Sequence, residues 1–308
     1  MIESVLITGA NAGLGKETAR QFALKQETRR VILFCRNRAR AAAAKKELEE
    51  KTGKIIFEVV IGDVTDADSV RKAVQDIKGT VDAVVLNAGG TIGKTAADPT
   101  PSGMNRLAAT NILGNVVLVD ELIKRDQLGK VVLAVSAEAV PGVKMLGVKR
   151  VSMSDSSVDQ FAAVLDGSYF GKKFVALNAY SYVKYAETMW ALCMARKYPA
   201  IKFVAVSPGN TKGTQAADSL PAPMRFMLNY VMMPIVFPLM GEMVHTLDVG
   251  AKRFVDAISD DRYKSGVFYA SKEGKLSGEM VDQSTFFTDL KNTTFQDNAY
   301  QAIHRFTH

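Results

Sequence analysis

The sequence is poor in the residues that build disulfide frameworks, metal sites and membrane spans. Its 308 residues include two cysteines, Cys35 and Cys193, and three histidines, His245, His304 and His308. Two dispersed cysteines exclude a disulfide framework, and neither they nor the isolated histidines show metal-ligand spacing. No apolar run reaches the roughly 18 residues that a membrane-spanning helix requires. We therefore expect no metal site, no membrane span and a reduced, cytoplasmic setting.

The charge pattern also argues against a nucleic-acid partner. The net charge is +7 and the mean hydropathy is +0.02, with 47% hydrophobic residues. Basic residues are scattered among acidic ones, with one local concentration at 35–46, so no general basic face is predicted. A strand beginning near Ile2 would leave no room for a targeting peptide ahead of it. The chain shows no internal repeat, low-complexity tract or linker, which indicates one domain over 1–308.

Short apolar segments alternate with helical patterns along most of the chain. Strands are predicted at 4–8, 30–35, 54–60, 81–87, 130–136, 201–207 and 266–270. Helices are predicted at 14–25, 38–51, 66–77, 103–126, 178–198 and 246–259. This alternation predicts an α/β fold with a doubly wound, parallel, seven-stranded sheet of Rossmann type. Two stretches, 137–177 and 209–245, do not fit the alternation.

A glycine-rich loop joins the first predicted strand to the first helix. The segment TGANAGLGKE places glycines at 9, 13 and 15. Glycines there allow a sharp turn and bring backbone N–H groups close to a pyrophosphate, beside the partial positive charge of a helix N-terminus. Such a triplet alone is weak, but its position after a first strand indicates a dinucleotide site. The spacing is GxxxGxG rather than GxGxxG.

Three further motifs follow in order: NAG at 87–89, Ser136 at the end of the fifth strand, and YSYVK at 180–184. Together with the glycine loop they resemble the short-chain dehydrogenase/reductase family, although Leu86 stands where many members carry an asparagine. CRNRARA at 35–41 and YKSGVFYA at 263–270 are similar to the branch of retinol dehydrogenases and protochlorophyllide reductases. The resemblance implies these cofactor-binding residues: Gly9, Asn11, Gly13, Leu14, Gly15, Asp63, Val64, Asn87, Ala88, Gly89, Tyr180, Lys184, Pro208 and Gly209.

The end of the second predicted strand bears on the choice of cofactor. NAD-binding members place a carboxylate there for the ribose hydroxyl, but this chain reads Cys35-Arg36-Asn37-Arg38. A guanidinium can bind a 2′-phosphate, whereas a carboxylate would repel it. We therefore expect NADP(H), held by Arg36 with Arg38 in support. A basic helix start that faces solvent is the alternative.

Tyr180 and Lys184 would lie one helical turn apart on the same face. Spacing alone is equally typical of an aromatic residue packed in a core. The family resemblance implies that Tyr180 is the acid/base, that the Lys184 ammonium lowers its pKa, and that Ser136 binds the substrate oxygen. It also implies that Asn111 holds a water in a proton relay. An amide on the helix surface or buried in the core is the alternative, with Asn115 as the nearest competitor.

The two irregular stretches suggest where the substrate and partner surfaces lie. The insertion at about 137–177 resembles that of monomeric carbonyl reductases, which implies a monomer rather than a tetramer. A short helix is predicted within it at 157–166. The stretch at about 209–245 falls where the family has a substrate lid, and 221–247 holds six of the thirteen methionines, which suits an apolar ligand. Core packing and peripheral membrane contact remain alternative interpretations.

These observations predict an NADPH-dependent oxidoreductase that reversibly reduces the carbonyl of an apolar ketone or aldehyde. Reduction of a conjugated C=C bond is the nearest alternative, with the same tyrosine protonating carbon or an enolate. A non-catalytic NADPH-binding regulator is the third hypothesis. Retention of both Tyr180 and Lys184 argues against it. The sequence leaves open the substrate, the direction of reaction and the role of 271–308.

Overall fold

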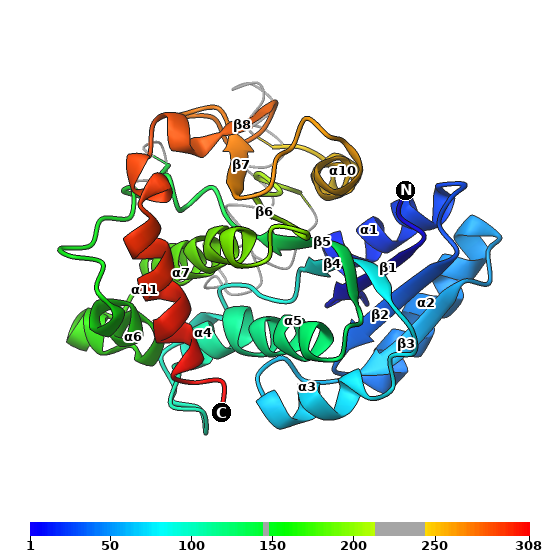
Figure 1. Ribbon diagram of the computed structural model, residues 1–308, viewed down its shortest axis with the longest axis horizontal. Coiled ribbons are helices and arrows are strands. Elements are labelled where there is room, and N and C mark those ends of the chain that lie inside the picture. The colour runs from blue at the N-terminus through cyan, green and yellow to red at the C-terminus, as the bar shows by residue number, and fades with distance from the viewer. Residues whose placement is uncertain (144–147, 213–243) are drawn as a thin grey trace.

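The computed structural model describes residues 1–143, 148–212 and 244–308 (Figure 1). Its centre is an eight-stranded sheet in the order β3-β2-β1-β4-β5-β6-β7-β8. Strands β1 to β7 are parallel, and β8 pairs antiparallel with β7. The predicted doubly wound α/β fold is confirmed, and its seven parallel strands are joined at one edge by an eighth, antiparallel strand that the sequence did not predict. The strands are β1 Ser4–Thr8, β2 Arg30–Cys35, β3 Phe57–Ile61, β4 Val81–Leu86, β5 Leu128–Val135, β6 Lys202–Val206, β7 Val267–Ser271 and β8 Met280–Asp282.

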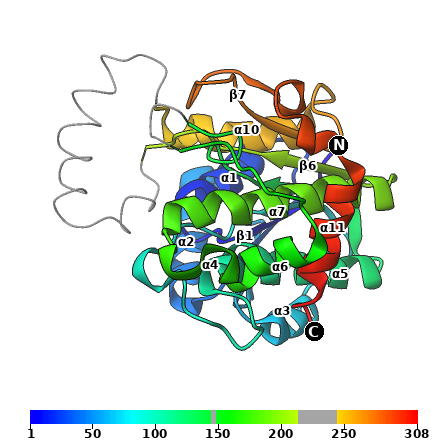
Figure 2. The ribbon, with the colours of Figure 1, turned by 90° about the vertical axis from the view of Figure 1, so that its left-hand side faces the viewer.

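Helices cover both faces of the sheet. They are α1 Gly13–Leu24, α2 Arg38–Thr52, α3 Ala67–Val74, α4 Arg106–Ala108, α5 Gly114–Lys124, α6 Val158–Asp166, α7 Ala176–Lys197, α10 Leu247–Ser259 and α11 Thr293–His304. Short 3-10 helices lie at Gly93–Thr95, Ser168–Lys173, Gln283–Thr285 and Thr288–Lys291. Figures 1 and 2 show α1, α2 and α10 on one face and α3, α5 and α7 on the other, in agreement with their packing.

Each strand contributes alternate residues to two apolar cores. In β1, Val5 and Ile7 pack in the core beneath α1, α2 and α10, whereas Leu6 packs in the core beneath α3, α5 and α7. All five residues of β1 are buried, because a parallel sheet covered on both faces leaves neither side to solvent. This explains why the strands read as nearly continuous apolar runs.

The helix predicted over 103–126 is interrupted, which corrects the sequence-based expectation. It consists of α4, one turn of π-helix at Ala109–Leu113, and α5. The backbone N–H of Gly114 donates to the carbonyl of Val64 at 2.8 Å. A Cβ on Gly114 would lie 2.4 Å from the Val64 Cα. The interruption therefore coincides with a close approach to the loop after β3, which only glycine permits.

The predicted insertion contributes a helix at 158–166, as expected, in the form of α6. The C-terminal segment, for which the sequence offered no motif, folds into α11. Helix α11 packs along α7 and also contacts α6. Helices α6 and α11 therefore flank α7 (Figure 2), whose residues 183–194 are all buried. Residues 144–147 of the insertion and most of the stretch predicted as a lid, 213–243, lie outside the described residues.

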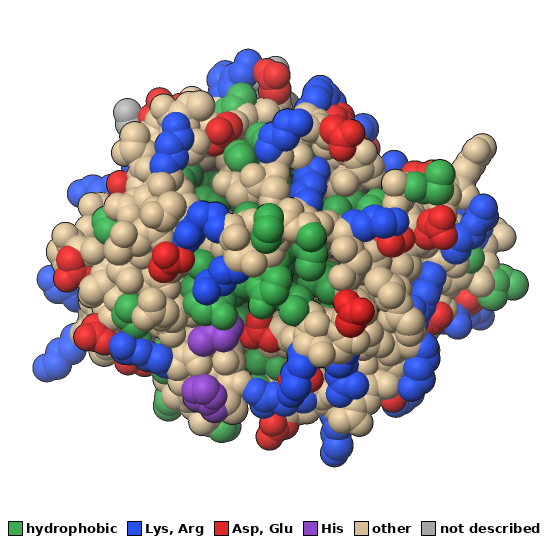
Figure 3. Space-filling view, in the orientation of Figure 1, with side chains coloured by type: hydrophobic (Ala, Val, Ile, Leu, Met, Phe, Trp, Pro, Cys, Tyr) green, Lys and Arg blue, Asp and Glu red, His purple; other side chains and the backbone are tan. Residues whose placement is uncertain are grey.

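The described surface carries mixed charge. On the face shown in Figure 3, basic and acidic side chains are interspersed rather than gathered into blocks of one sign. Among the helices of residues 1–143, 148–212 and 244–308, none is long and apolar enough to cross a membrane.

Candidate active site

A cavity of about 860 Å³ opens at the carboxyl ends of the parallel strands, where open α/β sheets bind ligands. Loops after β1, β2, β3, β4, β5 and β6 line it, together with α7. The structure brings nearly all of the predicted site residues to this cavity. Gly15, Arg38 and Asn111 do not line it.

The glycine loop is shaped by three glycines with different roles. Gly9 and Gly13 have φ angles of +68° and +53°, a region that side chains disfavour. A Cβ on Gly15 would lie 2.5 Å from Asn87 Nδ2 and 2.6 Å from the carbonyl oxygen of Gly9. Gly15 therefore lets α1 approach the loop closely, while Gly13, at the start of α1, borders the cavity. A helix N-terminus in this place is suited to a pyrophosphate.

Hydrogen bonds fix the glycine loop to the NAG segment after β4. Asn87 Nδ2 donates to the carbonyl of Thr8 at 2.8 Å, and the N–H of Ala88 donates to Thr8 Oγ1 at 2.8 Å. The Thr8 hydroxyl in turn donates to Asn115 Oδ1 at 3.0 Å, and Asn115 Nδ2 donates to the carbonyl of Ala88 at 3.0 Å. Thr8 and Asn115 thus position the floor of the cavity, a role that the sequence did not assign to either residue.

The end of the cavity near β2 is basic. Arg36, Asn37 and Arg40 line it, and the Arg36 side chain is 74% exposed and pairs with Asp63 at 3.6 Å. Asn37 Oδ1 accepts from the backbone N–H of Arg40 at 2.9 Å and so caps α2. Arg40, rather than the predicted Arg38, therefore borders the cavity beside Arg36. Sequence reasoning missed Arg40 because the cap at Asn37 decides which helix residues face inward.

Lys16 lies near the glycine loop but does not point into the cavity. Lys16, in the first turn after the glycine loop, forms an ion pair with Glu47 of α2 at 2.7 Å. Lys16 does not line the cavity. The basic character of the cavity end therefore comes from Arg36 and Arg40.

Tyr180 and Lys184 project from α7 into the same cavity. Lys184 Nζ lies 5.8 Å from the centre of the Tyr180 ring. It donates to the carbonyl of Val135 at 2.9 Å and to Glu187 Oε2 at 2.7 Å. Burial raises the pKa of Tyr180, the charge of Lys184 lowers it, and the charge of Glu187 raises it. Together these effects leave the pKa of Tyr180 above its ordinary value. The expected direction of the lysine effect is present, but burial outweighs it.

Glu187 is a buried carboxylate that the sequence did not single out. Its side chain is 1% exposed, and that of Lys184 is 2% exposed. Burial raises the pKa of Glu187 to about 7, with Lys184 acting in the opposite direction. Burial disfavours the charged form of Lys184 as well, but Glu187 and Tyr180 outweigh it and raise the pKa of the lysine. The signal available was a glutamate three positions after Lys184 within an apolar helix segment.

Ser136 lies buried just beyond the end of β5 and lines the cavity. Its Oγ is 2.7 Å from Thr188 Oγ1, and the Thr188 hydroxyl donates to the carbonyl of Lys184 at 2.7 Å. Since a hydroxyl has one proton, Ser136 is the donor in its contact with Thr188. Ser136 would have to rotate this proton away from Thr188 to donate to a substrate oxygen.

Asn111 lies in the π-helical turn and is fully buried. Its Oδ1 accepts from the N–H of Gly90 at 3.0 Å, and its Nδ2 donates to the carbonyls of Gly90 and Leu107 at 2.9 and 2.8 Å. A Cβ on Gly89 would lie 2.4 Å from Asn111 Oδ1. The side chain thus supports the loop after β4, and the predicted relay role of Asn111 stays a prediction.

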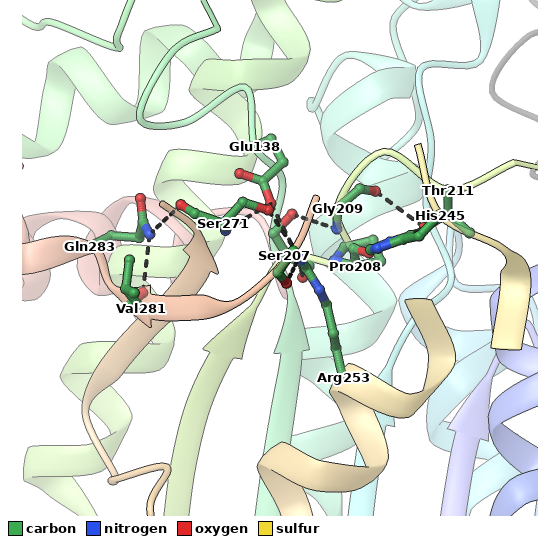
Figure 4. Close-up of polar contacts among 11 residues, drawn as sticks. Glu138, Ser207, Pro208, Gly209, Thr211, His245, Arg253, Ser271, Val281 and Gln283 are labelled. Atoms are coloured by element: carbon green, nitrogen blue, oxygen red, sulfur yellow. Dashed lines mark hydrogen bonds and ion pairs between the residues drawn. The ribbon is translucent and has the colours of Figure 1, made fainter. Parts of the chain in front are cut away.

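A polar network beside the cavity joins α10 and β7 to the loops that follow β5, β6 and β7 (Figure 4). Glu138, two residues after Ser136, accepts at Oε1 from the N–H and the hydroxyl of Ser271 at 3.0 and 2.9 Å. Arg253 of α10 pairs with the same oxygen at 3.3 Å and donates to the carbonyls of Ser207 and Gly278 at 3.1 and 2.8 Å. Burial raises the pKa of Glu138 and lowers that of Arg253. The network fixes the backbone immediately before Pro208 and Gly209.

The cavity also has an apolar portion. Its members are Ile92, Val143, Val148, Leu177 and Leu276. Val143 and Val148 exchange backbone hydrogen bonds of 2.8 and 3.1 Å, so the insertion itself reaches the cavity. No group of three His, Cys, Asp or Glu side chains suited to a metal ion occurs among the residues that the structure describes.

Comparisons with known proteins agree with this geometry. The sequence profile of the short chain dehydrogenase family matches residues 3–149. Bovine dehydrogenase/reductase SDR family member 12 is 30% identical over 209 residues, which are 66% of this chain and 59% of that protein. An oxidoreductase of Emericella nidulans is 26% identical over 241 residues, which are 76% of this chain and 66% of that protein. The chain thus spans less than two thirds of the length of these two relatives.

Solved structures show the same fold at lower identity. The NADPH-bound carbonyl reductase from chicken fatty liver has a TM-score of 0.59 at 21% identity, covering 90% of this chain and 99% of that one. The L-sorbose reductase of Gluconobacter frateurii, complexed with NADPH and L-sorbose, has a TM-score of 0.65 at 18% identity, covering 91% and 98%. The fold is of Rossmann type, with one cavity that brings together the glycine loop, the NAG segment, Ser136, Tyr180 and Lys184. Over residues 3–149 the chain is similar to the short chain dehydrogenase family, and the two relatives extend this similarity to 66% and 76% of the chain.

Proposed function

We propose that this protein is an NADPH-dependent reductase of the carbonyl group of apolar ketones or aldehydes. One observation carries the proposal: Tyr180 and Lys184 line the same cavity as the glycine loop and the basic end formed by Arg36 and Arg40. A proton donor, a cation beside it and a dinucleotide cradle are thereby combined in one site.

The residues of the cavity fit a bound NADPH. Gly13, at the start of α1, lines the cavity, and a Cβ built on it would meet no atom within 4 Å, so this end of the helix has room for a pyrophosphate. The end of β2 carries no carboxylate, and Arg36 and Arg40 would bind a 2′-phosphate. Lys184 would hold the nicotinamide ribose hydroxyls, and Pro208 would border the nicotinamide side.

Bound NADPH would supply the hydride for the carbonyl carbon. Tyr180 would then give its phenolic proton to the carbonyl oxygen, and Ser136 would orient that oxygen. The Lys184 ammonium would stabilise the phenolate left on Tyr180 until a proton from solvent restores it. Val143, Val148 and Leu177 would contact the apolar part of the substrate, which supports an apolar substrate class.

The decisive assay is the loss of NADPH absorbance with a panel of ketones, aldehydes and enones. Tyr180→Phe should reduce turnover by roughly two orders of magnitude or more because it removes the proton donor. Tyr182→Phe is the matched control: Tyr182 lies on the same helix, donates to the carbonyl of Ser152 at 3.0 Å and does not line the cavity. Equal rates for the two variants would refute the assignment.

The same panel separates the competing functions. Turnover confined to enones would favour reduction of a C=C bond. Tight NADPH binding without turnover of any compound would favour a regulator.

Cofactor choice has its own test. Replacing Arg36 and Arg40 with serine should weaken NADPH relative to NADH by roughly 10- to 100-fold, because charge-assisted hydrogen bonds to a phosphate are lost. Arg38→Ser is the control, since Arg38 does not line the cavity. An unchanged ratio of the two dissociation constants would show that these arginines do not select the cofactor.

The coverage of α7 supports a monomer. Helices α6 and α11 pack against α7, and residues 183–194 of α7 are all buried within the chain itself. Light scattering after size exclusion should give a mass near 33.5 kDa. A mass four times larger would contradict this part of the proposal.

A further inference from the structure

The ion pair between Lys184 and Glu187 is unusual for its complete burial. Both side chains lie on the inward side of α7, with Lys184 Nζ 2.7 Å from Glu187 Oε2 and exposed fractions of 2% and 1%. The lysine also donates to the carbonyl of Val135 on β5 at 2.9 Å. The ammonium is therefore held between the helix and the end of β5, next to Ser136.

The glutamate is not explained by packing. Its Oε1 is buried without a hydrogen-bond partner among the described residues. The neighbouring positions Ala186, Met189 and Trp190 are buried and apolar. Burying a carboxylate with one oxygen unsatisfied is costly, and an apolar residue of similar volume would serve a core position as well or better. The contact with Lys184 is the interaction that distinguishes glutamate here.

That contact acts on the electrostatics of Tyr180. A cation near a phenol favours loss of its proton, and an anion near the same phenol disfavours it. Lys184 lowers the pKa of Tyr180 and Glu187 raises it. In the part of the chain that the structure describes, Lys184 is the one charged side chain that shifts the pKa of Glu187. Several elements pack against α7, namely β5, β6, β7, α4, α6, α11 and the π-helical turn. No charged side chain on any of them shifts the pKa of Glu187.

We propose that Glu187 is a positioning residue that fixes the Lys184 ammonium against β5 and, through its negative charge, keeps the proton on Tyr180. The inference rests on the proposed function of Tyr180 as proton donor and extends it to the direction of catalysis. A tyrosine that retains its proton is prepared to protonate a carbonyl oxygen. It is poorly prepared to remove a proton from an alcohol. Glu187 thus adapts the site to reduction.

The test compares Glu187→Gln, which removes the charge at nearly constant shape, with Glu187→Asp, which keeps the charge on a shorter side chain. Ionisation of Tyr180 is followed by tyrosinate absorbance, as the difference between each protein and its Tyr180→Phe counterpart. In Glu187→Gln the midpoint should fall by roughly one pH unit or more. In Glu187→Asp it should stay close to that of the parent chain. Equal midpoints in all three proteins, or equal shifts in both variants, would overturn the proposal.

Activity provides a second measurement. With a carbonyl substrate, the rate of reduction should decline at high pH where Tyr180 loses its proton, and Glu187→Gln should move this decline to lower pH. The reverse reaction, oxidation of the alcohol, should gain rate at neutral pH in the same variant. A charge effect predicts both changes, whereas a general structural defect would lower both rates without moving the profile.

Two outcomes separate this inference from the proposed function. If no carbonyl compound is reduced, the absorbance titration still decides whether Glu187 controls Tyr180. If Glu187→Gln folds poorly, the double variant Lys184→Met, Glu187→Gln removes both buried charges. Its Tyr180 midpoint should then lie near that of the parent chain, because the two opposing effects are lost together. A midpoint lowered as far as that expected for Glu187→Gln alone would refute the pairing.

Discussion

Replacing Arg253 with methionine should destabilise the protein far more than the same change at the preceding residue. Arg253 is 5% exposed and lies 3.3 Å from Glu138, whose side chain is 10% exposed. At an effective dielectric constant of about 20, opposite charges at this distance attract by about 5 kcal/mol. Desolvation offsets much of this attraction, but removing one partner leaves the other charge buried and uncompensated.

The hydrogen bonds of Arg253 add to the expected loss. Its guanidinium also donates to the carbonyls of Ser207 and Gly278 and to the hydroxyl of Ser271. We expect Arg253→Met to lower the free energy of unfolding by about 4 kcal/mol, within the range for broken buried ion pairs. Lys252→Met should cost less than about 1 kcal/mol, because Lys252 is 64% exposed and pairs with Asp256 at the surface.

Urea denaturation followed by the fluorescence of Trp190, the single tryptophan, measures both losses. Glu138→Gln should lie between the two, since glutamine keeps an acceptor for Ser271 without the charge. If the free energies of unfolding of Arg253→Met and Lys252→Met agree within about 1 kcal/mol, the buried network does not stabilise the packing of β7 and α10, and the prediction is refuted.

Two further predictions concern the cofactor loop and the C-terminal helix. Gly15→Ala should weaken NADPH binding by roughly 10-fold or more in a fluorescence titration, because the alanine Cβ would lie 2.6 Å from the carbonyl oxygen of Gly9. Gly53→Ala, at the end of α2, is the control and should reduce stability without changing NADPH affinity. Burial opposes the charged form of His304, but its hydrogen bond to Asp120 prevails and raises the pKa of the histidine. This stabilisation is complete below the unfolded pKa of about 6.5 and is lost as pH rises through the folded value, so His304→Gln should lower the melting temperature at acidic pH and have little effect at alkaline pH.

The parallel strands could be predicted because burial on both faces imposes continuous apolar runs. Strand β8 could not, because its three residues, Met280–Asp282, pair at the edge of the sheet and carry no apolar pattern. The π-helical turn was also missed. It coincides with a hydrogen bond from the N–H of Gly114 to the carbonyl of Val64, which lies about fifty positions away in the chain.

In the candidate site, too, some features follow from the local sequence and others from contacts between residues distant in the chain. Tyr180 and Lys184 could be predicted because their helical spacing and neighbouring motifs are local. Glu187 could not, since glutamate in a helix is usually solvated, and only the packing of α7 on the sheet buries it. The choice between Arg38 and Arg40 also required the structure, because the cap at Asn37 sets the direction of each side chain.

The pairing of Thr211 with His245 has a consequence for engineering. These residues form a parallel bridge although 34 positions separate them. The N–H of Lys212 donates to the carbonyl of His245 at 2.9 Å, and the N–H of His245 donates to the carbonyl of Asn210 at 3.0 Å. The described residues on either side of 213–243 are therefore held next to each other by backbone hydrogen bonds. Closing a loop of a different length between them would cost little additional entropy.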